Sequence, residues 1–482
     1  MDKRTKIIAT ISDKRCEVEF IRSLYEAGMN AVRINTAHVT TRSAATIVEN
    51  VRRVSEKIAI IIDTKGPEIR LTGMAAGFES GIPIEKGQLV RMKGTAEDRP
   101  SSDQTIYLND PTIYDAVPTG SIILIDDGEL ELQVVDKADD ELVCEVHNGG
   151  VIKPRKSVNI PGVPIDLPSV TDKDHEFINW AIDMDIDFIA HSFVRKKSDV
   201  LAVKKILKDR NSSIKIISKI ENSEGVDNID EILDETYGIM VARGDLGVEI
   251  PAERIPVTQR LLVKKCIESK KPVIIATQML HTMIEHPRPT RAEISDVANA
   301  IYQRVDAVML SGETANGLYP VEAVATMARV AREIENDEVN NGPNIDMNLV
   351  RINNEITAQL ARSAVRASIN IDTLSGRTGR YVAAFRGQMP VYAVCYRKST
   401  MRQLALSYGV HAIYCEPSVS REGFLLNILY YLEDRKWLSK EDLIVVLGGS
   451  FGAATGASFL EIGNVLNLEH KALSQYNAYR KD

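Results

Sequence analysis

Two charged side chains, Lys219 and Glu221, end an apolar segment in the stretch KIISKIEN, residues 215–222. Isoleucines at positions 214, 216, 217 and 220 predict a buried strand here. Side chains of a strand alternate between its two faces, so Lys219 and Glu221, two residues apart, project from the same face. A lysine beside a carboxylate where a buried strand ends is a candidate for chemistry on an anion.

A second carboxylate, Asp245, follows the next apolar segment, in GIMVARGDLG. Glu221 and Asp245 at the ends of neighbouring strands can share one Mg²⁺, which takes one or two protein carboxylates and completes its shell with substrate oxygens and water. A lysine close to a divalent cation is unfavourable unless an anion lies between them. The three residues together predict a phosphate or carboxylate substrate.

The elements that must position these residues are eight short apolar segments, most of them followed by a helix-length stretch. Near-continuous apolar strands alternating with helices predict a closed parallel (β/α) barrel, or TIM barrel. The segments are residues 5–11, 31–36, 58–66, 187–193, 214–222, 238–247, 272–280 and 306–314.

The sequence texture changes twice along the chain. From about residue 71 to 162 it becomes rich in turns and alternating strands, such as SIILIDDGELELQVV, in which Asp127-Gly128 predicts a hairpin turn. The polar stretch DEVNNGPNIDMN precedes a renewed run of helices and strands. We therefore expect a barrel from residues 1–70 and 163–340, an inserted all-β lid domain after the third strand, itself a small β-barrel, at 71–162, and a C-terminal α/β domain at 348–482.

Composition indicates an ordinary enzyme of a reducing compartment. The formal net charge of −8 and the lack of a sustained Lys/Arg block argue against nucleic acid as the main partner. Five widely separated cysteines without a C-x-x-C pair indicate free thiols. No apolar run reaches the roughly 20 residues of a membrane helix, and the first residues lack the apolar stretch of a signal peptide. We expect a cytoplasmic protein without a membrane partner.

Active sites of such barrels lie at the C-terminal ends of the strands. Any one polar residue there is more often a solvated charge or part of a local ion pair, but many of them converge on one rim. The polar residues at these ends are Arg33, Asn35, His38, Asp63, Thr64, Lys65, Glu68, Arg70, Ser192, Arg195, Lys219, Glu221, Arg243, Gly244, Asp245, Thr277, Gln278, Ser311, Glu313 and Thr314.

At this rim the chain resembles the pyruvate kinase family. The motifs that carry the resemblance include GMNAVRINTAH, DTKGPEIR, IISKIEN, GIMVARGDLGVEIP, KPVIIATQML and DAVMLSGETANGLYP, and they span most of residues 5 to 325 in order. The C-terminal region matches more loosely. The resemblance implies a barrel with an inserted lid and a C-terminal regulatory domain. It also implies phosphoryl transfer from phosphoenolpyruvate to ADP, which gives ATP and an enolate that is protonated to pyruvate.

The resemblance implies roles for the rim residues in substrate binding and catalysis. Glu221 and Asp245 resemble the ligands of the catalytic Mg²⁺ or Mn²⁺, and Lys219 resembles the ammonium that stabilises the transferring phosphoryl group. Arg33 resembles the guanidinium on that group. Gly244 resembles a backbone contact to substrate, and Thr277 the hydroxyl on the protonation route.

The resemblance also implies a monovalent cation and a nucleotide site. Asn35, Asp63 and Thr64 resemble ligands of K⁺, and Arg70 and Lys156 resemble contacts to the nucleotide phosphates, which Asn35 and His38 also touch. Ala37 in NTAH departs from the family's NFSH, because a methyl group cannot coordinate K⁺. Glu68 is the residue type that accompanies a K⁺ requirement in this family, so we expect K⁺ to activate with weakened affinity.

In the C-terminal domain the stretch DTLSGRT, residues 372–378, resembles the family's effector phosphate loop. Its alternative interpretation is a polar connection between a strand and a helix. Later in the chain, GGSFGAATGAS lacks the tryptophan and arginine that some members activated by fructose 1,6-bisphosphate place there. We therefore expect a monophosphate effector and, from the family, a homotetramer. The effector residues are Thr373, Ser375, Gly376 and Thr378.

Two other functions stay open at this point. A metal-dependent barrel aldolase or lyase acting on pyruvate-like substrates would also place a glutamate and an aspartate around Mg²⁺, but it would not need the lid. A non-catalytic sensor would keep the fold, but it would have no need to keep Lys219, Glu221, Asp245 and Thr277 together.

Overall fold

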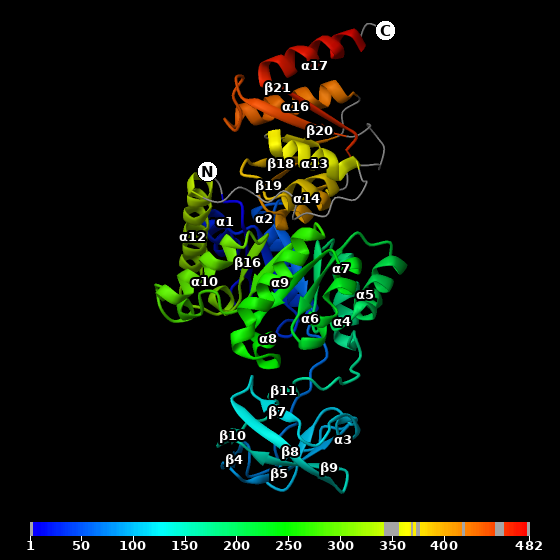
Figure 1. Ribbon diagram of the computed structural model, residues 1–482, viewed down its shortest axis with the longest axis vertical. Helices are drawn as coiled ribbons and strands as arrows, with labels where there is room; N and C mark the ends of the chain where they lie inside the picture. Colours follow the sequence, from blue (N-terminus) through cyan, green and yellow to red (C-terminus); the bar gives the residue numbers. More distant parts are fainter. Residues whose placement is uncertain are drawn as a thin grey trace.

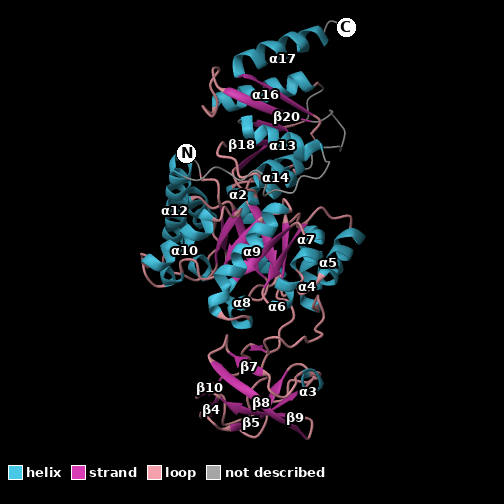
Figure 2. Ribbon diagram, in the orientation of Figure 1, coloured by secondary structure: helices cyan, strands magenta, loops and turns pink. Residues whose placement is uncertain are grey.

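The computed structural model describes residues 3–341, 356–367, 370–372, 376–416, 420–448 and 457–479. Three bodies follow one another along the long axis of the molecule, with the lid at one end, the barrel in the middle and the C-terminal domain at the other end (Figure 1). The lid is built mainly of strands and contains one short helix, α3, whereas helices surround the barrel (Figure 2).

Eight parallel strands close the barrel in the order β1-β16-β15-β14-β13-β12-β3-β2. Each predicted apolar segment forms one of them, which confirms the predicted fold class. Their inward side chains form a small apolar core that includes Ile61, Phe188 and Met240. The strands are β1 (Lys6–Thr10), β2 (Ala31–Asn35), β3 (Ala59–Asp63), β12 (Phe188–His191), β13 (Lys215–Ile220), β14 (Gly238–Ala242), β15 (Val273–Ala276) and β16 (Ala307–Leu310).

Helices cover the outside of the barrel because each buries an apolar stripe against the strands. Several begin with a side-chain cap: Thr171 caps α4 and Thr290 caps α10 through reciprocal bonds with the third residue of the helix. The helices are α1 (Val18–Ala27), α2 (Thr41–Val54), α4 (Asp172–Asp183), α5 (Lys197–Asp209), α6 (Ser223–Asp227), α7 (Ile229–Glu235), α8 (Arg243–Glu249), α9 (Ile255–Glu268), α10 (Arg291–Tyr302), α11 (Gly312–Ala315) and α12 (Pro320–Asn341), with 3₁₀ turns at Ala252–Arg254 and His281–Ile284.

The lid follows β3 and has an apolar core of its own, which includes Ile69, Met92 and Ile160. The hairpin predicted at Asp127-Gly128 joins β7 to β8 antiparallel, and Asp126 and Asp127 both have left-handed φ angles there. A six-stranded sheet in the order β11-β7-β8-β9-β5-β6 lies beside the pair β10-β4. The elements are β4 (Ile82–Ile84), β5 (Leu89–Gly94), β6 (Ile106–Leu108), α3 (Ile113–Ala116), β7 (Ile122–Ile125), β8 (Leu130–Ala138), β9 (Glu141–Val146), β10 (Gly150–Ile152) and β11 (Val158–Asn159).

In the described part of the C-terminal domain, five strands form a sheet in the order β19-β18-β17-β20-β21, and of these β21 alone runs antiparallel to its neighbour. The elements are α13 (Ile356–Ala367), β17 (Asn370–Asp372), α14 (Arg377–Ala384), β18 (Val391–Cys395), α15 (Lys398–Gln403), a 3₁₀ turn (Leu404–Leu406), β19 (Val410–Tyr414), α16 (Arg421–Asp434), β20 (Leu443–Gly448), β21 (Phe459–Asn464) and α17 (Val465–Tyr479).

This domain is joined to the barrel by buried contacts. The guanidinium of Arg386 pairs with Asp306, just before β16, at 2.5 Å, and both side chains are buried. The largest apolar cluster contains residues of both bodies, among them Val308 and Phe385. Within the part of the chain that the structure describes, no helix combines the length and hydropathy needed to cross a bilayer.

Candidate active site

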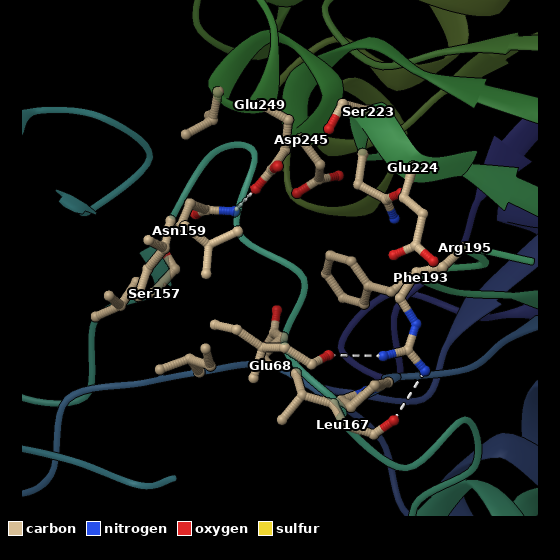
Figure 3. A pocket seen from close by; sticks show the side chains of 18 of the residues that line it. Glu68, Ser157, Asn159, Leu167, Phe193, Arg195, Ser223, Glu224, Asp245 and Glu249 are labelled. Carbon is tan, nitrogen blue, oxygen red and sulfur yellow. Dashed lines mark hydrogen bonds between the residues drawn. The ribbon is translucent and has the colours of Figure 1, made fainter. Parts of the chain in front are cut away.

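A cleft of about 760 Å³ separates the lid from the C-terminal ends of the barrel strands. Ser157 and Asn159 line it from the lid, and Phe193, Asp245 and Glu249 line it from the barrel (Figure 3). A hydrogen bond crosses the cleft from lid to barrel: Asn159 Nδ2 donates to Glu249 Oε1 at 3.0 Å. Burial raises the pKa of Glu249, and the nearby charge of Asp245 raises it further, although the Asn159 hydrogen bond opposes this.

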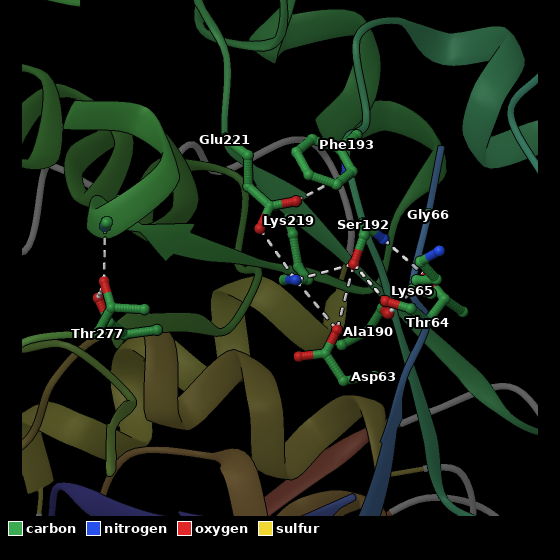
Figure 4. Close-up of polar contacts among 12 residues, drawn as sticks. Asp63, Thr64, Lys65, Gly66, Ala190, Ser192, Phe193, Lys219, Glu221 and Thr277 are labelled. Carbon is green, nitrogen blue, oxygen red and sulfur yellow. Dashed lines mark hydrogen bonds and ion pairs between the residues drawn. The ribbon is translucent and has the colours of Figure 1, made fainter. Parts of the chain in front are cut away.

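Lys219 is the centre of a charged cluster at the ends of β3, β12 and β13 (Figure 4). Its Nζ lies 3.0 Å from Asp63 Oδ1 and 2.9 Å from Glu221 Oε1. It also donates to Ser192 Oγ at 2.8 Å. The ammonium is thus held between two carboxylates in a buried position.

The electrostatics of this cluster stabilise the charges of Lys219 and Asp63 but disfavour that of Glu221. Burial by itself would lower the pKa of Lys219, but Asp63 and Glu221 outweigh burial and raise it, so the side chain is a cation. Burial would likewise raise the pKa of Asp63, but Arg33 and Lys219 lower it overall. For Glu221 burial dominates and raises the pKa, with Lys219 opposing it and Asp245 adding to it. Glu221 is thus a carboxylate that benefits from a further positive charge.

Arg33, the middle residue of β2, belongs to the same cluster. Its Nε lies 2.5 Å from Asp63 Oδ2 and its Nη1 donates to Thr10 Oγ1 at 3.2 Å. Asp63 therefore fixes two cations, Arg33 and Lys219, on one side of the barrel rim. Two fixed cations on one rim are suited to a multiply charged anion.

The carboxylates of Glu221 and Asp245 fit a hard divalent cation whose remaining ligands come from the substrate and water. Glu221 Oε2 accepts a hydrogen bond from Phe193 N at 2.7 Å, which fixes the carboxylate. Asp245 faces the cleft and, among the described residues, its side chain makes no hydrogen bond or ion pair. The described residues contain no group of three or more His, Cys, Asp or Glu arranged as a metal site. Two carboxylates are enough for Mg²⁺ when the substrate and water supply the other oxygens.

Thr277 lies after β15 and contacts Gly244 at the start of α8. The Gly244 amide donates to Thr277 Oγ1 at 2.7 Å, and this hydroxyl donates to Ala276 O at 2.6 Å. Thr277 and Gln278 have φ angles of 68° and 54°, which are strained for residues with a side chain. A Cβ at Gly244 would lie 3.4 Å from Thr277 Oγ1, an ordinary contact, so the protein itself does not exclude a side chain there.

The three residues expected at a K⁺ site lie together, because Asn35 and Asp63 are direct partners in the β2–β3 register and Thr64 follows Asp63. Their oxygens already accept internal hydrogen bonds: Asn35 Oδ1 from Ala37 N at 3.0 Å, and Thr64 O from Ser192 Oγ at 2.6 Å. These three residues offer only oxygen ligands, as K⁺ requires, but some of the same oxygens also accept hydrogen bonds within the protein.

The residues expected to hold nucleotide lie in two places. Arg70 and Lys156 line the cleft and are held by Glu68 at 2.6 Å and Asp126 at 2.7 Å, respectively. His38 is exposed and is not among the residues that line the cleft. Of the residues expected at the effector loop, Gly376 opens α14 with a φ of 70° and Thr378 is buried, whereas Thr373 and Ser375 lie outside the described residues.

Sequence reasoning gave no role to three contacts of this site. They are the bond of Ser192 to Lys219, the bond of the Phe193 amide to Glu221, and the bond of Asn159 to Glu249. Ser192 and Phe193 directly follow β12, so their position at a strand end was the only available signal.

Comparison with known proteins gives one consistent family. The sequence-family model for the pyruvate kinase barrel domain matches residues 2–324, and the sequence-family model for the pyruvate kinase alpha/beta domain matches residues 355–462. A pyruvate kinase of Borreliella burgdorferi is 45% identical over 477 residues, covering 96% of this chain and 98% of that protein. A pyruvate kinase of Geobacillus stearothermophilus is 43% identical, covering 95% of this chain and 80% of that protein. The crystal structure of a pyruvate kinase from Cryptosporidium parvum superposes with a TM-score of 0.88 at 35% identity, covering 96% of each chain. The chain belongs to the pyruvate kinase family.

Proposed function

We propose that the lid–barrel cleft and the cluster around Lys219 transfer the phosphoryl group of phosphoenolpyruvate to ADP. The observation that carries this assignment is the buried ammonium of Lys219, held 3.0 Å from Asp63 and 2.9 Å from Glu221 at the strand ends. As a member of its family, the chain is a phosphotransferase of glycolysis that forms pyruvate and ATP.

Phosphoryl transfer needs little covalent help from the protein and depends on alignment and on stabilisation of the moving charge. Lys219 and Arg33 supply fixed positive charges for the phosphoryl oxygens as the bond from phosphorus to the enol oxygen breaks. Asp63 keeps both cations in place, so they need no reorganisation during the reaction. Mg²⁺ or Mn²⁺, when bound by Glu221 and Asp245, supplies Lewis-acid stabilisation of the same anion.

The second half of the reaction is protonation of the enolate carbon to give pyruvate. Thr277 is our candidate for the hydroxyl on this route. Its Oγ1 is fixed by Gly244 N at 2.7 Å and Ala276 O at 2.6 Å, so it is pre-oriented at the rim. The strained backbone at Thr277 supports a functional reason for this conformation.

The nucleotide is assigned to the lid side of the cleft. Arg70 and Lys156 line the cleft with cationic groups, and we assign them to the phosphates of ADP and ATP. We also assign Asn35 and His38 to the nucleotide, although neither lines this cleft. We also assign K⁺ to Asn35, Asp63 and Thr64. We propose activation by a phosphorylated metabolite at the start of α14, a homotetrameric assembly and a cytoplasmic location.

A coupled assay of pyruvate formation from phosphoenolpyruvate tests the assignment. Pyruvate should form only when ADP and Mg²⁺ are both present, in equal amounts with ATP. Pyruvate released at the same rate without ADP would indicate a lyase or hydrolase, and no turnover under any condition would indicate a sensor that has kept the fold.

A further inference from the structure

The segment between β12 and α5, residues Ser192–Arg195, contacts the catalytic cluster on one side. We call it the hinge turn. Ser192 Oγ accepts a hydrogen bond from Lys219 Nζ at 2.8 Å, and Phe193 N donates to Glu221 Oε2 at 2.7 Å. Phe193 has a left-handed φ of 53°, an unfavourable conformation for a bulky residue. The hinge turn is thus held in one strained shape and sets the position of Glu221.

The other side of the hinge turn holds the chain that returns from the lid. Arg195 Nη1 donates to Ile165 O at 2.9 Å and its Nη2 donates to Leu167 O at 2.8 Å. Figure 3 labels Arg195 and Leu167 at this side of the cleft. Both acceptors are backbone carbonyls, so Arg195 binds the main chain of the segment that connects the lid to the barrel. Only 13% of its side chain is exposed.

Asp199, in the first turn of α5, fixes the guanidinium of Arg195, which we call the Arg195 fork because two of its nitrogens bond the two carbonyls. Its Oδ2 lies 3.3 Å from Arg195 Nε and its Oδ1 lies 3.3 Å from Arg195 Nη2. The same carboxylate accepts Ser169 Oγ at 2.7 Å, so it too contacts the returning chain. The guanidinium is therefore pre-oriented, and movement of residues 165–169 must act on it.

The chain that enters the lid packs against the same hinge turn. Gly66 has a φ of +69°, and a Cβ there would lie 2.8 Å from both Ser192 Cβ and Phe193 Cδ2. Ser192 Oγ also contacts Thr64 O at 2.6 Å. Both lid connections therefore contact the hinge turn, in which Ser192 and Phe193 hold Lys219 and Glu221.

We propose that Arg195 is a positioning residue that couples the lid to the substrate and metal site through the hinge turn. A lid drawn down by nucleotide moves residues 165–169, and Arg195 transmits that movement to Phe193 and so to Glu221. Nucleotide and phosphoenolpyruvate then strengthen each other's binding, as linkage requires. This inference rests on the proposed function, because it assigns nucleotide to the lid side of the cleft.

The test measures the coupling factor, the ratio of the phosphoenolpyruvate half-saturation concentrations at vanishing and at saturating ADP. In the unmodified protein we expect a factor of about 5 or more. Arg195→Met keeps the aliphatic length but removes the fork, and should bring the factor to within about twofold of 1 while phosphoenolpyruvate affinity without ADP changes less than about threefold. Arg195→Lys keeps the charge beside Asp199 but cannot bond two carbonyls in the same geometry, and should give the same loss.

A matched control is Arg210→Met at the C-terminal end of α5, where the guanidinium pairs with Asp183 away from the lid. It should leave the coupling factor unchanged. Hydrogen exchange by mass spectrometry supplies a second readout, because amides of residues 163–170 should exchange faster in Arg195→Met and not in Arg210→Met.

The outcomes separate two kinds of failure. A protein that forms no pyruvate contradicts the proposed function. If the unmodified protein is active but its coupling factor is 1, the coupling role is wrong. The same follows if Arg195→Lys retains the full coupling factor, and Arg195 is then only a stabilising residue. If Arg195→Met does not fold, Arg195→Lys decides by the same criteria.

Discussion

The ammonium of Lys219 lies 3.0 Å from Asp63 Oδ1, although β13 and β3 are not neighbours in the barrel. Strand β12 lies between them, and Ser192 at its end contacts both side chains, at 2.8 Å from Lys219 Nζ and 3.2 Å from Asp63 Oδ1. With Arg33 of β2, which pairs with Asp63, the charged cluster therefore spans four adjacent strands of the rim. Each member is fixed by the others before substrate arrives.

Replacement of Lys219 tests its role in phosphoryl transfer. Lys219→Met removes positive charge where negative charge moves, so turnover should fall by roughly 10² to 10³ or more, and phosphoenolpyruvate affinity should fall less. Steady-state kinetics check this, with thermal unfolding to monitor stability. Lys215→Met, at the opposite end of β13, is the matched control and should keep turnover within about twofold. Near-normal turnover in Lys219→Met would refute the assignment.

Thr277 separates the two half-reactions. Thr277→Val removes the hydroxyl that fixes Gly244 N, and it should impair solvent proton exchange into pyruvate more than phosphoryl transfer. Thr277→Ser keeps the hydroxyl and should retain most of the exchange. Deuterium incorporation followed by NMR measures it. Intact exchange combined with a collapse of phosphoryl transfer in Thr277→Val would show that the assignment is wrong.

The K⁺ assignment is tested at Ala37. Its amide already donates to Asn35 Oδ1, and its carbonyl accepts from Lys173 Nζ at 3.4 Å, so a serine there would add one oxygen to an ordered loop. Ala37→Ser should lower the K⁺ concentration for half-activation. Titration of activity with KCl at constant ionic strength measures the change, with tetramethylammonium as the inert cation. Full activity without K⁺ and Na⁺ would dispose of the idea.

A buried histidine predicts sensitivity to acid. Burial lowers the pKa of His191 from 6.5 to about 4, with Asp199 and Asp174 opposing the shift and Lys219 adding to it. Between these values the unfolded chain binds a proton that the folded protein does not, so stability falls as pH drops from 6.5 toward 4, by about 1.4 kcal/mol per pH unit.

The measurement compares thermal unfolding at pH 7 and pH 5.5 for the unmodified protein and for His191→Leu, which fills the site without a titrating group. The unmodified protein should lose more stability on acidification. Equal losses in the two proteins would show that other groups account for the acid sensitivity.

The effector loop predicts a response to phosphorylated metabolites. A sugar or nucleoside monophosphate should raise phosphoenolpyruvate affinity by a factor of roughly 5 to 150. The double change of Ser375 and Thr378 to alanine should abolish that activation and leave basal turnover intact. Because Thr378 is buried, Thr378→Ser alone is a useful control that keeps the hydroxyl. An unchanged response in the double variant would make the loop a simple connection.

Much of the fold could be predicted from the sequence because its signals are local. Eight apolar segments gave the eight barrel strands, and Asp127-Gly128 gave the β7–β8 hairpin. Strand ends also identified Lys219, Glu221 and Asp245 as rim residues, because parallel strands in a barrel bring their C-terminal ends together. The domain boundaries and the roles of the rim residues stay predictions.

The contacts between distant segments could not be predicted in this way. The Arg195 fork joins carbonyls 28 and 30 residues away, and the Asn159–Glu249 bond joins residues 90 apart. Carbonyls carry no sequence signal, since every residue has one. Their partners depend on where the returning chain crosses the rim, which only the folded barrel defines.

Because the lid has an apolar core of its own, the lid and the rest of the molecule are two units that can unfold separately. The barrel and the C-terminal domain share one apolar cluster and the buried Arg386–Asp306 pair, so loss of one leaves apolar surface and an unpaired carboxylate on the other. The lid core, by contrast, is a distinct cluster reached through two connecting segments. The lid can therefore melt, or be cut at those segments by a protease, while the rest of the molecule stays folded.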